Sequence, residues 1–97
     1  MSVLDSVLQE EYERSERMKS AMESELNELP KGYVSTKKIA GKVYYYLQQR
    51  VKMKIVGTYI PPEDLAVIKK QIDRRKQLEE SIRELKANMK KIRRVTR

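Results

Sequence analysis

The sequence predicts an α+β fold: a long N-terminal helix, a three-stranded antiparallel β-meander and a long C-terminal helix, in that order. Three observations support this prediction. Apolar residues recur every three or four positions at both ends of the chain, a spacing typical of helices. In the middle third, β-branched and aromatic residues predominate with a period of two. Pro30, Gly32 and Pro61 mark the transitions between these segments.

The first element is expected to be a helix over about residues 3–29. Its apolar positions form one stripe, and glutamates occupy the other faces. Pro30 ends the helix, because proline disfavours the helical conformation of the residue before it, and Gly32 accepts the turn that follows. The stripe consists of Leu4, Leu8, Tyr12, Ser15, Met18, Met22, Leu26 and Leu29.

The β-meander is expected over about residues 33–60. A tight turn at Gly41 and Lys42 predicts strands of about 34–40 and 43–50. The third strand should cover about residues 54–60. Around residues 51–53 no Gly, Asn or Asp is present to supply a positive φ, so this second turn is placed only to within about two residues.

The last element is expected to be a helix over about residues 62–95. Residues 61–64 favour a helix start, since proline is tolerated in the first turn and acidic residues complement the helix dipole. We expect the two helices to pair as an antiparallel, coiled-coil-like hairpin; the alternative is a homodimer in which each helix pairs with a second copy. The apolar seam of this helix comprises Leu65, Ile68, Ile72, Leu78, Ile82, Leu85, Met89 and Ile92.

Charge is sorted by segment along the chain. Residues 1–29 have a net charge of −5, whereas residues 30–60 hold seven basic side chains and no acidic one. Residues 61–97 carry +6, and the whole chain carries +8. The opposite charges of the two helices favour their pairing, and the acid-free middle segment indicates a binding surface without naming its ligand.

Composition limits the size and the chemistry of the protein. With 97 residues, 39% of them hydrophobic and 37% charged, the chain is expected to form a single domain over residues 1–97 with a thin core. It has no histidine and no cysteine, so the usual general base, thiol nucleophile and zinc ligands are missing. We therefore predict a non-enzymatic protein without cofactor or metal. No apolar run long enough for a membrane span or signal peptide is present, which predicts a cytoplasmic protein.

Alternation along the strands divides the predicted sheet into two faces. The face expected to form the core comprises Val34, Thr36, Lys38, Ala40, Val43, Tyr45, Leu47 and Gln49. The other face comprises Tyr33, Ser35, Lys37, Ile39, Tyr44, Tyr46, Gln48 and Arg50. If the second turn also has an even number of residues, Val56 and Ile60 join the first face, and Ile55, Gly57 and Tyr59 join the second.

Tyrosines among lysines and an arginine, without carboxylates, suit nucleic acid, because bases stack on aromatic rings and basic side chains displace counterions from phosphate. The alternative is that these tyrosines form core or protein contacts. A basic tail over residues 86–97 can act as a sequence-independent phosphate clamp or simply be a solvated helix end. The candidate binding residues are Lys37, Lys38, Lys42, Tyr44, Tyr46, Arg50, Lys52, Lys54, Lys90, Lys91, Arg93 and Arg94.

Several short runs in the middle of the chain form one recognisable pattern: Pro30 to Ser35, Ile39 to Lys42, Tyr44 to Gln48 with Arg50, and Tyr59 with Ile60. This pattern resembles a family of small uncharacterised prokaryotic domains. Members of that family read GxxSxKxIxGKxYYYLQxR between two helices, and the resemblance covers about residues 29–92. It implies the helix, meander and helix order and says little of function. The meander beside a helix is also similar, in architecture alone, to the arm-binding domains of phage-type integrases.

Two functions are therefore expected from different classes. The first is a non-enzymatic module that contacts nucleic acid through the tyrosine-rich basic face and the basic tail. The alternative is a protein-binding inhibitor of the anti-CRISPR type, or an assembly factor, of phage or mobile-element origin. Such a protein would act on a nucleic-acid-handling complex, and neither function involves a membrane.

Overall fold

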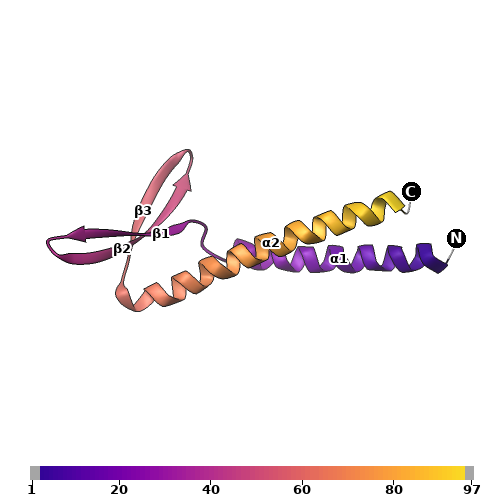
Figure 1. Cartoon of the computed structure of the whole chain (residues 1–97), viewed down its shortest axis with the longest axis horizontal. Helices are drawn as coiled ribbons and strands as arrows, with labels where there is room; N and C mark the ends of the chain where they lie inside the picture. Colours follow the sequence, from indigo (N-terminus) through magenta and orange to yellow (C-terminus); the bar gives the residue numbers. More distant parts are fainter. Residues whose placement is uncertain (1–2, 96–97) are drawn as a thin grey trace. The chain divides into compact units, whose positions relative to one another are not determined.

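A computed structural model describes residues 3–95 and contains two long helices and three strands (Figure 1). Helix α1 covers Val3–Asn27, and helix α2 covers Leu65–Val95 after the 3₁₀ turn η1 at Pro62–Asp64. Strands β1, β2 and β3 cover Tyr33–Ile39, Lys42–Val51 and Lys54–Ile60. The predicted α+β class and element order are confirmed, with α1 ending two residues before the predicted boundary.

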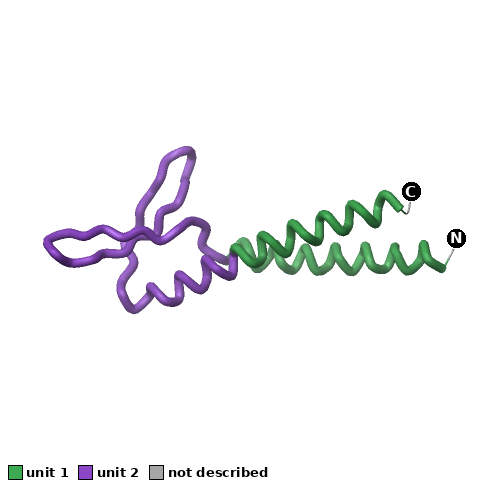
Figure 2. The backbone as a smooth tube through the Cα atoms, viewed as in Figure 1, with its two compact units in different colours: residues 1–28, 76–97 green, residues 29–75 purple. Residues whose placement is uncertain are grey.

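The chain forms two compact units (Figure 2). The helical unit consists of residues 1–28 and 76–97, and the sheet unit consists of residues 29–75. Helix α2 contributes to both, since its first residues belong to the sheet unit and its remainder to the helical unit. That the two units fold together as a single domain over residues 1–97 stays a prediction.

In the helical unit, α1 and the C-terminal part of α2 run antiparallel and side by side (Figures 1 and 2). Leu78, Ile82 and Met89 of α2 are buried, together with Ser15 of α1. The predicted seam of α2 is confirmed here, whereas the stripe of α1 is partly wrong: Leu4 is 64% exposed and Met18 43% exposed. Pairing of these helices with a second copy stays a prediction.

The sheet has the strand order β1-β2-β3, and both strand pairs are antiparallel. The first turn is at Ala40 and Gly41, one residue before the predicted position, and the second is at Lys52 and Met53. All four turn residues have positive φ, which is typical of two-residue hairpin turns whose twist matches the strands. The second turn has no glycine, so its sequence carries no conventional turn signal.

Two hairpin arms extend from the centre of the sheet, because β2 is longer than either neighbour. Residues 45–48 of β2 pair with both β1 and β3, residues 42–44 pair only with β1, and residues 49–51 pair only with β3. The β1-β2 arm and the β2-β3 arm diverge, and their turns lie apart (Figure 1). Side chains in the arms are consequently more exposed than those at the centre.

The core of the sheet unit lies on the face that contains Ile60. Ile60 is 2% exposed and pairs with Tyr45, so both side chains lie on the face predicted to be the core. From α2, Ile72 is buried and Lys69 lies over the Tyr45 ring, with Nζ 5.9 Å from the ring centroid. The start of α2 therefore covers this face, which leaves the opposite face without cover from this segment.

Arg75 fills a position where the apolar seam of α2 is interrupted. Its Nη1 donates a hydrogen bond to the carbonyl oxygen of Leu29, at 3.0 Å. This carbonyl lies just after the end of α1, where backbone oxygens lack helical partners. Sequence periodicity did not predict this contact, since an arginine in an apolar seam looks like an interruption of the pattern.

Over residues 3–95, neither helix has the length and apolar character needed to span a membrane.

Candidate nucleic-acid interface

Three tyrosines form a cluster on the sheet face opposite Ile60, here called the tyrosine face. Tyr46 and Tyr59 are paired across β2 and β3, with ring centroids 6.0 Å apart and an interplanar angle of 69°. Tyr44 also contacts Tyr59, at 6.3 Å and 56°. Such edge and tilted arrangements are favourable for aromatic pairs. Tyr44 and Tyr46 are half-buried, whereas Tyr59 is 48% exposed.

A lysine from the neighbouring strand is packed against this cluster. Lys37 Nζ lies 5.2 Å from the centroid of the Tyr46 ring, within range of a cation–π interaction. Lys37 is itself exposed, so its charge stays available to a partner while its side chain is positioned by the ring. The tyrosine face thus places a cation directly beside aromatic surface.

A polar contact holds the tyrosine face at its other side. Gln48 Nε2 donates a hydrogen bond to Ser35 Oγ at 2.9 Å, and the Gln48 amide lies over Gly57. A Cβ added at Gly57 would come within 3.1 Å of that amide, so the glycine provides the space for it. The neighbouring Gln49 points to the other face and donates to the carbonyl oxygen of Lys31 at 2.8 Å.

The sheet brings some of the predicted binding residues together and separates others. Strand pairing places Lys37, Lys42, Tyr44, Tyr46 and Arg50 on the tyrosine face. Lys38 pairs with Val43 and Lys54 with Val51, so both lie on the opposite face, and Lys52 occupies the second turn. The faces predicted from alternation agree with the observed register.

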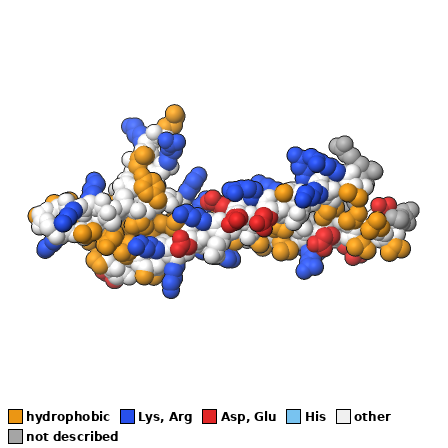
Figure 3. All heavy atoms as spheres, viewed as in Figure 1, with side chains coloured by type: hydrophobic (Ala, Val, Ile, Leu, Met, Phe, Trp, Pro, Cys, Tyr) orange, Lys and Arg blue, Asp and Glu red, His pale blue; other side chains and the backbone are white. Residues whose placement is uncertain are grey.

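The predicted tail residues belong to the helical unit. Lys90, Lys91, Arg93 and Arg94 are exposed near the end of α2, where Lys and Arg side chains gather (Figure 3). Arg93 is the one with a defined contact, since its Nη2 donates a hydrogen bond to Tyr12 Oη at 3.0 Å. Arg97, which also belongs to the predicted tail, lies outside the described residues.

Other residues of the tyrosine face were missed as binding candidates. Tyr33 is 55% exposed and pairs with Gln48, while Tyr59 lies at the centre of the aromatic cluster. Alternation assigned both tyrosines to this face, but neither was included among the candidate binding residues. The cross-strand pairing of Tyr59 with Tyr46 was the signal that could have identified it.

Both hairpin arms carry basic side chains beside apolar ones (Figure 3). Between residues 30 and 60 no acidic residue is present to oppose them. Near the tip of the β2-β3 arm, Met53 is 93% exposed and Ile55 62% exposed, beside Lys52 and Lys54. No group of three or more side chains suited to a metal ion occurs among residues 3–95.

The comparison with protein families identifies one match. The family described as Domain of unknown function (DUF6788) matches residues 8–70, which include most of α1, the whole sheet and the start of α2. The chain belongs to the DUF6788 family. This confirms that it is related to an uncharacterised domain family, and the match begins earlier and ends earlier than the resemblance expected from the tyrosine motif. Neither the curated proteins nor the solved structures contain a match to the chain.

Proposed function

We propose that this DUF6788 protein is a non-enzymatic module that binds nucleic acid through the tyrosine face of its sheet. The observation that carries the proposal is the cluster of Tyr44, Tyr46 and Tyr59 with Lys37 packed against it, on a sheet without acidic residues. Exposed rings offer stacking surface to unpaired bases, and the lysines and arginine of the arms can contact phosphates.

Ring exposure favours a single strand over a duplex as the ligand. Tyr33 and Tyr59 are each about half exposed, and both lie on the tyrosine face. Stacking on a base requires an accessible ring face, which unpaired bases can reach and stacked base pairs cannot. The cations near the end of α2 would add attraction that does not depend on sequence.

The experiment compares two lysines that contact tyrosines on opposite faces of the sheet. Lys37 lies over Tyr46 on the tyrosine face, and Lys69 lies over Tyr45 on the covered face. Lys37→Gln should weaken binding of a fluorescent oligo(dT), measured by anisotropy, whereas Lys69→Gln should leave it nearly unchanged. Both variants lose one charge, so equal losses would mean that only net charge matters, which would refute a site on the tyrosine face.

A second variant tests stacking rather than charge. Tyr59→Leu keeps an apolar side chain beside Tyr44 and Tyr46 but removes the ring. Because stacking contributes about 1–3 kcal/mol per base, the Kd for oligo(dT) should rise roughly 5- to 150-fold. Circular dichroism should show unchanged helix content. Retained affinity in a folded Tyr59→Leu protein would count against stacking at this position.

The apolar side chains of the arms favour a second candidate, a protein-binding inhibitor or assembly factor. Ile39, Val43, Met53 and Ile55 are all more than half exposed, which is typical of surfaces that contact other proteins. As this second candidate, the protein would come from a phage or mobile element and would act on a nucleic-acid-handling complex. Binding dominated by apolar contacts should change little with salt, whereas phosphate contacts weaken steeply.

A further inference from the structure

A cleft between the two helices of the helical unit is lined mainly by cations. It has a volume of about 280 Å³ and lies between Tyr12 and Lys19 of α1 and the residues Lys86, Met89, Lys90 and Arg93 of α2. This volume is near the lower end of the range for small-molecule sites, which is roughly 300–1,000 Å³. Four of the six lining side chains are basic, and none is acidic.

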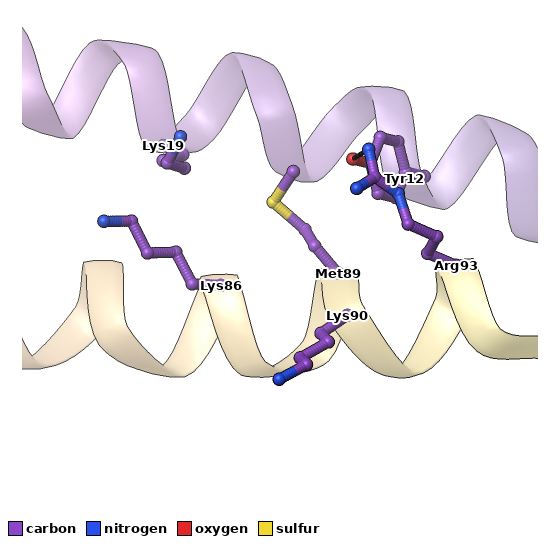
Figure 4. Close-up of a pocket in the computed structure, with 6 residues that line it drawn as sticks. All are labelled: Tyr12, Lys19, Lys86, Met89, Lys90 and Arg93. Atoms are coloured by element: carbon purple, nitrogen blue, oxygen red, sulfur yellow. Dashed lines mark hydrogen bonds between the residues drawn. The ribbon is translucent and has the colours of Figure 1, made fainter.

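Two of the four cations extend from α2 toward α1 across the cleft. Figure 4 shows Lys86 extending from α2 toward Lys19 on α1, and Arg93 extending toward Tyr12, while Lys90 points away from α1. Met89 is 8% exposed and extends between the helices, so it forms an apolar floor. The cleft therefore combines an apolar base with a basic opening.

Contacts with α1 position two of these cations. Arg93 donates to Tyr12 Oη at 3.0 Å and also lies over the Tyr12 ring, with Cζ 5.7 Å from the centroid. Lys19 Nζ is 3.3 Å from Glu23 Oε1 in an ion pair within α1. Among the residues that the structure describes, Lys86 has no ion-pair partner. Lys86 therefore brings a positive charge without an acidic partner to the cleft, and an anion bound beside it would be stabilised by that charge.

We propose that this cleft is an anion site that takes a phosphate group, either on a free phosphorylated compound or on a nucleic-acid strand. Lysine ammonium and arginine guanidinium groups are the usual protein partners of phosphate. Lys86 and Lys19 would contact the anion from the two helices, and Tyr12 would hold the Arg93 guanidinium at its edge. The proposal does not rest on the function of the tyrosine face, since none of these residues belongs to the sheet unit.

The experiment measures binding of sodium pyrophosphate by isothermal titration calorimetry at constant ionic strength. Lys86→Gln should weaken pyrophosphate binding about tenfold or more, because it removes a charged contact with the anion. The matched control is Lys76→Gln, which removes the same charge from an exposed position on the same helix that does not line the cleft. Its affinity should stay within about twofold of the unmodified protein.

Further titrations distinguish the sources of the phosphate. ATP and oligo(dT) are each titrated into the unmodified, Lys86→Gln and Lys37→Gln proteins. A loss for ATP in Lys86→Gln but not in Lys37→Gln supports a site for free phosphorylated compounds. A loss for oligo(dT) alone in Lys86→Gln supports the same site occupied by a nucleic-acid strand.

Two results would overturn the proposal of an anion site. In the first, Lys86→Gln binds pyrophosphate, ATP and oligo(dT) no more weakly than the unmodified protein does, which means that none of them occupies the cleft. In the second, Lys86→Gln and Lys76→Gln weaken the binding of every ligand equally, which indicates diffuse attraction by net charge. Binding of oligo(dT) that is lost only in Lys37→Gln would support the tyrosine face while contradicting the cleft.

Discussion

At the scale of single residues, two glycines of the sheet unit have positive φ values but differ in the space around them. Gly32 has a φ of 131°, and a Cβ added there would lie 2.2 Å from the backbone oxygen of Gln48. Gly41 has a φ of 82°, but an added Cβ would meet nothing within 4 Å. Gly32 is therefore required for both space and backbone conformation, whereas Gly41 is required for backbone conformation alone.

Alanine at these two positions should have different effects. Gly32→Ala should destabilise the protein by about 3 kcal/mol or more, because the methyl group meets an immovable backbone atom as well as an unfavourable φ. Gly41→Ala should cost only about 1 kcal/mol, from the left-handed conformation alone. Urea denaturation measures both free energies of unfolding, and equal losses would show that the contact between Gly32 and Gln48 does not exist in solution.

Alternation along the strands predicted which face each sheet residue occupies, and the register agrees. It predicted Tyr44 and Tyr46 beside Lys37, because opposite residues in paired strands share a face. It could not predict the Gln48 bond to Ser35 or the stacking of Lys37 on Tyr46, since these depend on side-chain conformations. The site was thus predictable as a surface, whereas its internal contacts were not.

At the scale of elements, the β2-β3 arm has an unusual turn. Lys52 and Met53 have φ values of 48° and 68°, a region that residues other than Gly, Asn and Asp seldom adopt. This unfavourable turn places Lys52 and Met53 at the tip of the arm, where Met53 is 93% exposed. Unfavourable backbone conformations that persist in this way often mark functional segments.

Replacing this turn with a conventional one should stabilise the protein. Lys52→Asn with Met53→Gly introduces the pair that best suits two consecutive positive φ values, and should raise the free energy of unfolding by about 1 kcal/mol. The matched control, Lys52→Gln with Met53→Leu, has no such preference and should leave stability nearly unchanged. Thermal unfolding followed by circular dichroism measures both, and an unstabilised Asn-Gly variant would mean that the turn has another geometry.

The helices were the most predictable elements, because a repeat of three and four residues is sustained over many turns. The seam of α2 is confirmed at Leu78, Ile82 and Met89. The stripe of α1 failed at Leu4 and Met18, since periodicity shows where apolar residues align but not how far the partner helix covers them. Arg75 illustrates the opposite error, because its bond to the Leu29 carbonyl gives a structural role to an apparent interruption.

At the scale of the whole molecule, charge is the property that connects sequence with proposed function. The acid-free residues 30–60 fold into the sheet, and their basic side chains are distributed over both arms. The DUF6788 match covers this sheet completely, so the tyrosine face lies within the part of the chain that matches the family. The tyrosine face, which combines basic side chains with aromatic surface and carries no acidic residue, is the central observation behind the proposed nucleic-acid binding.

The most direct test of that claim is the salt dependence of oligonucleotide binding. Fluorescence anisotropy with oligo(dT) between about 50 and 200 mM NaCl should show affinity falling linearly on a double-logarithmic plot. Six phosphate contacts with a single strand would lower the affinity by roughly 300-fold across this range. Absence of binding to single-stranded and double-stranded oligonucleotides at the lowest salt, or an affinity that does not change with salt, would contradict a nucleic-acid function for this sheet.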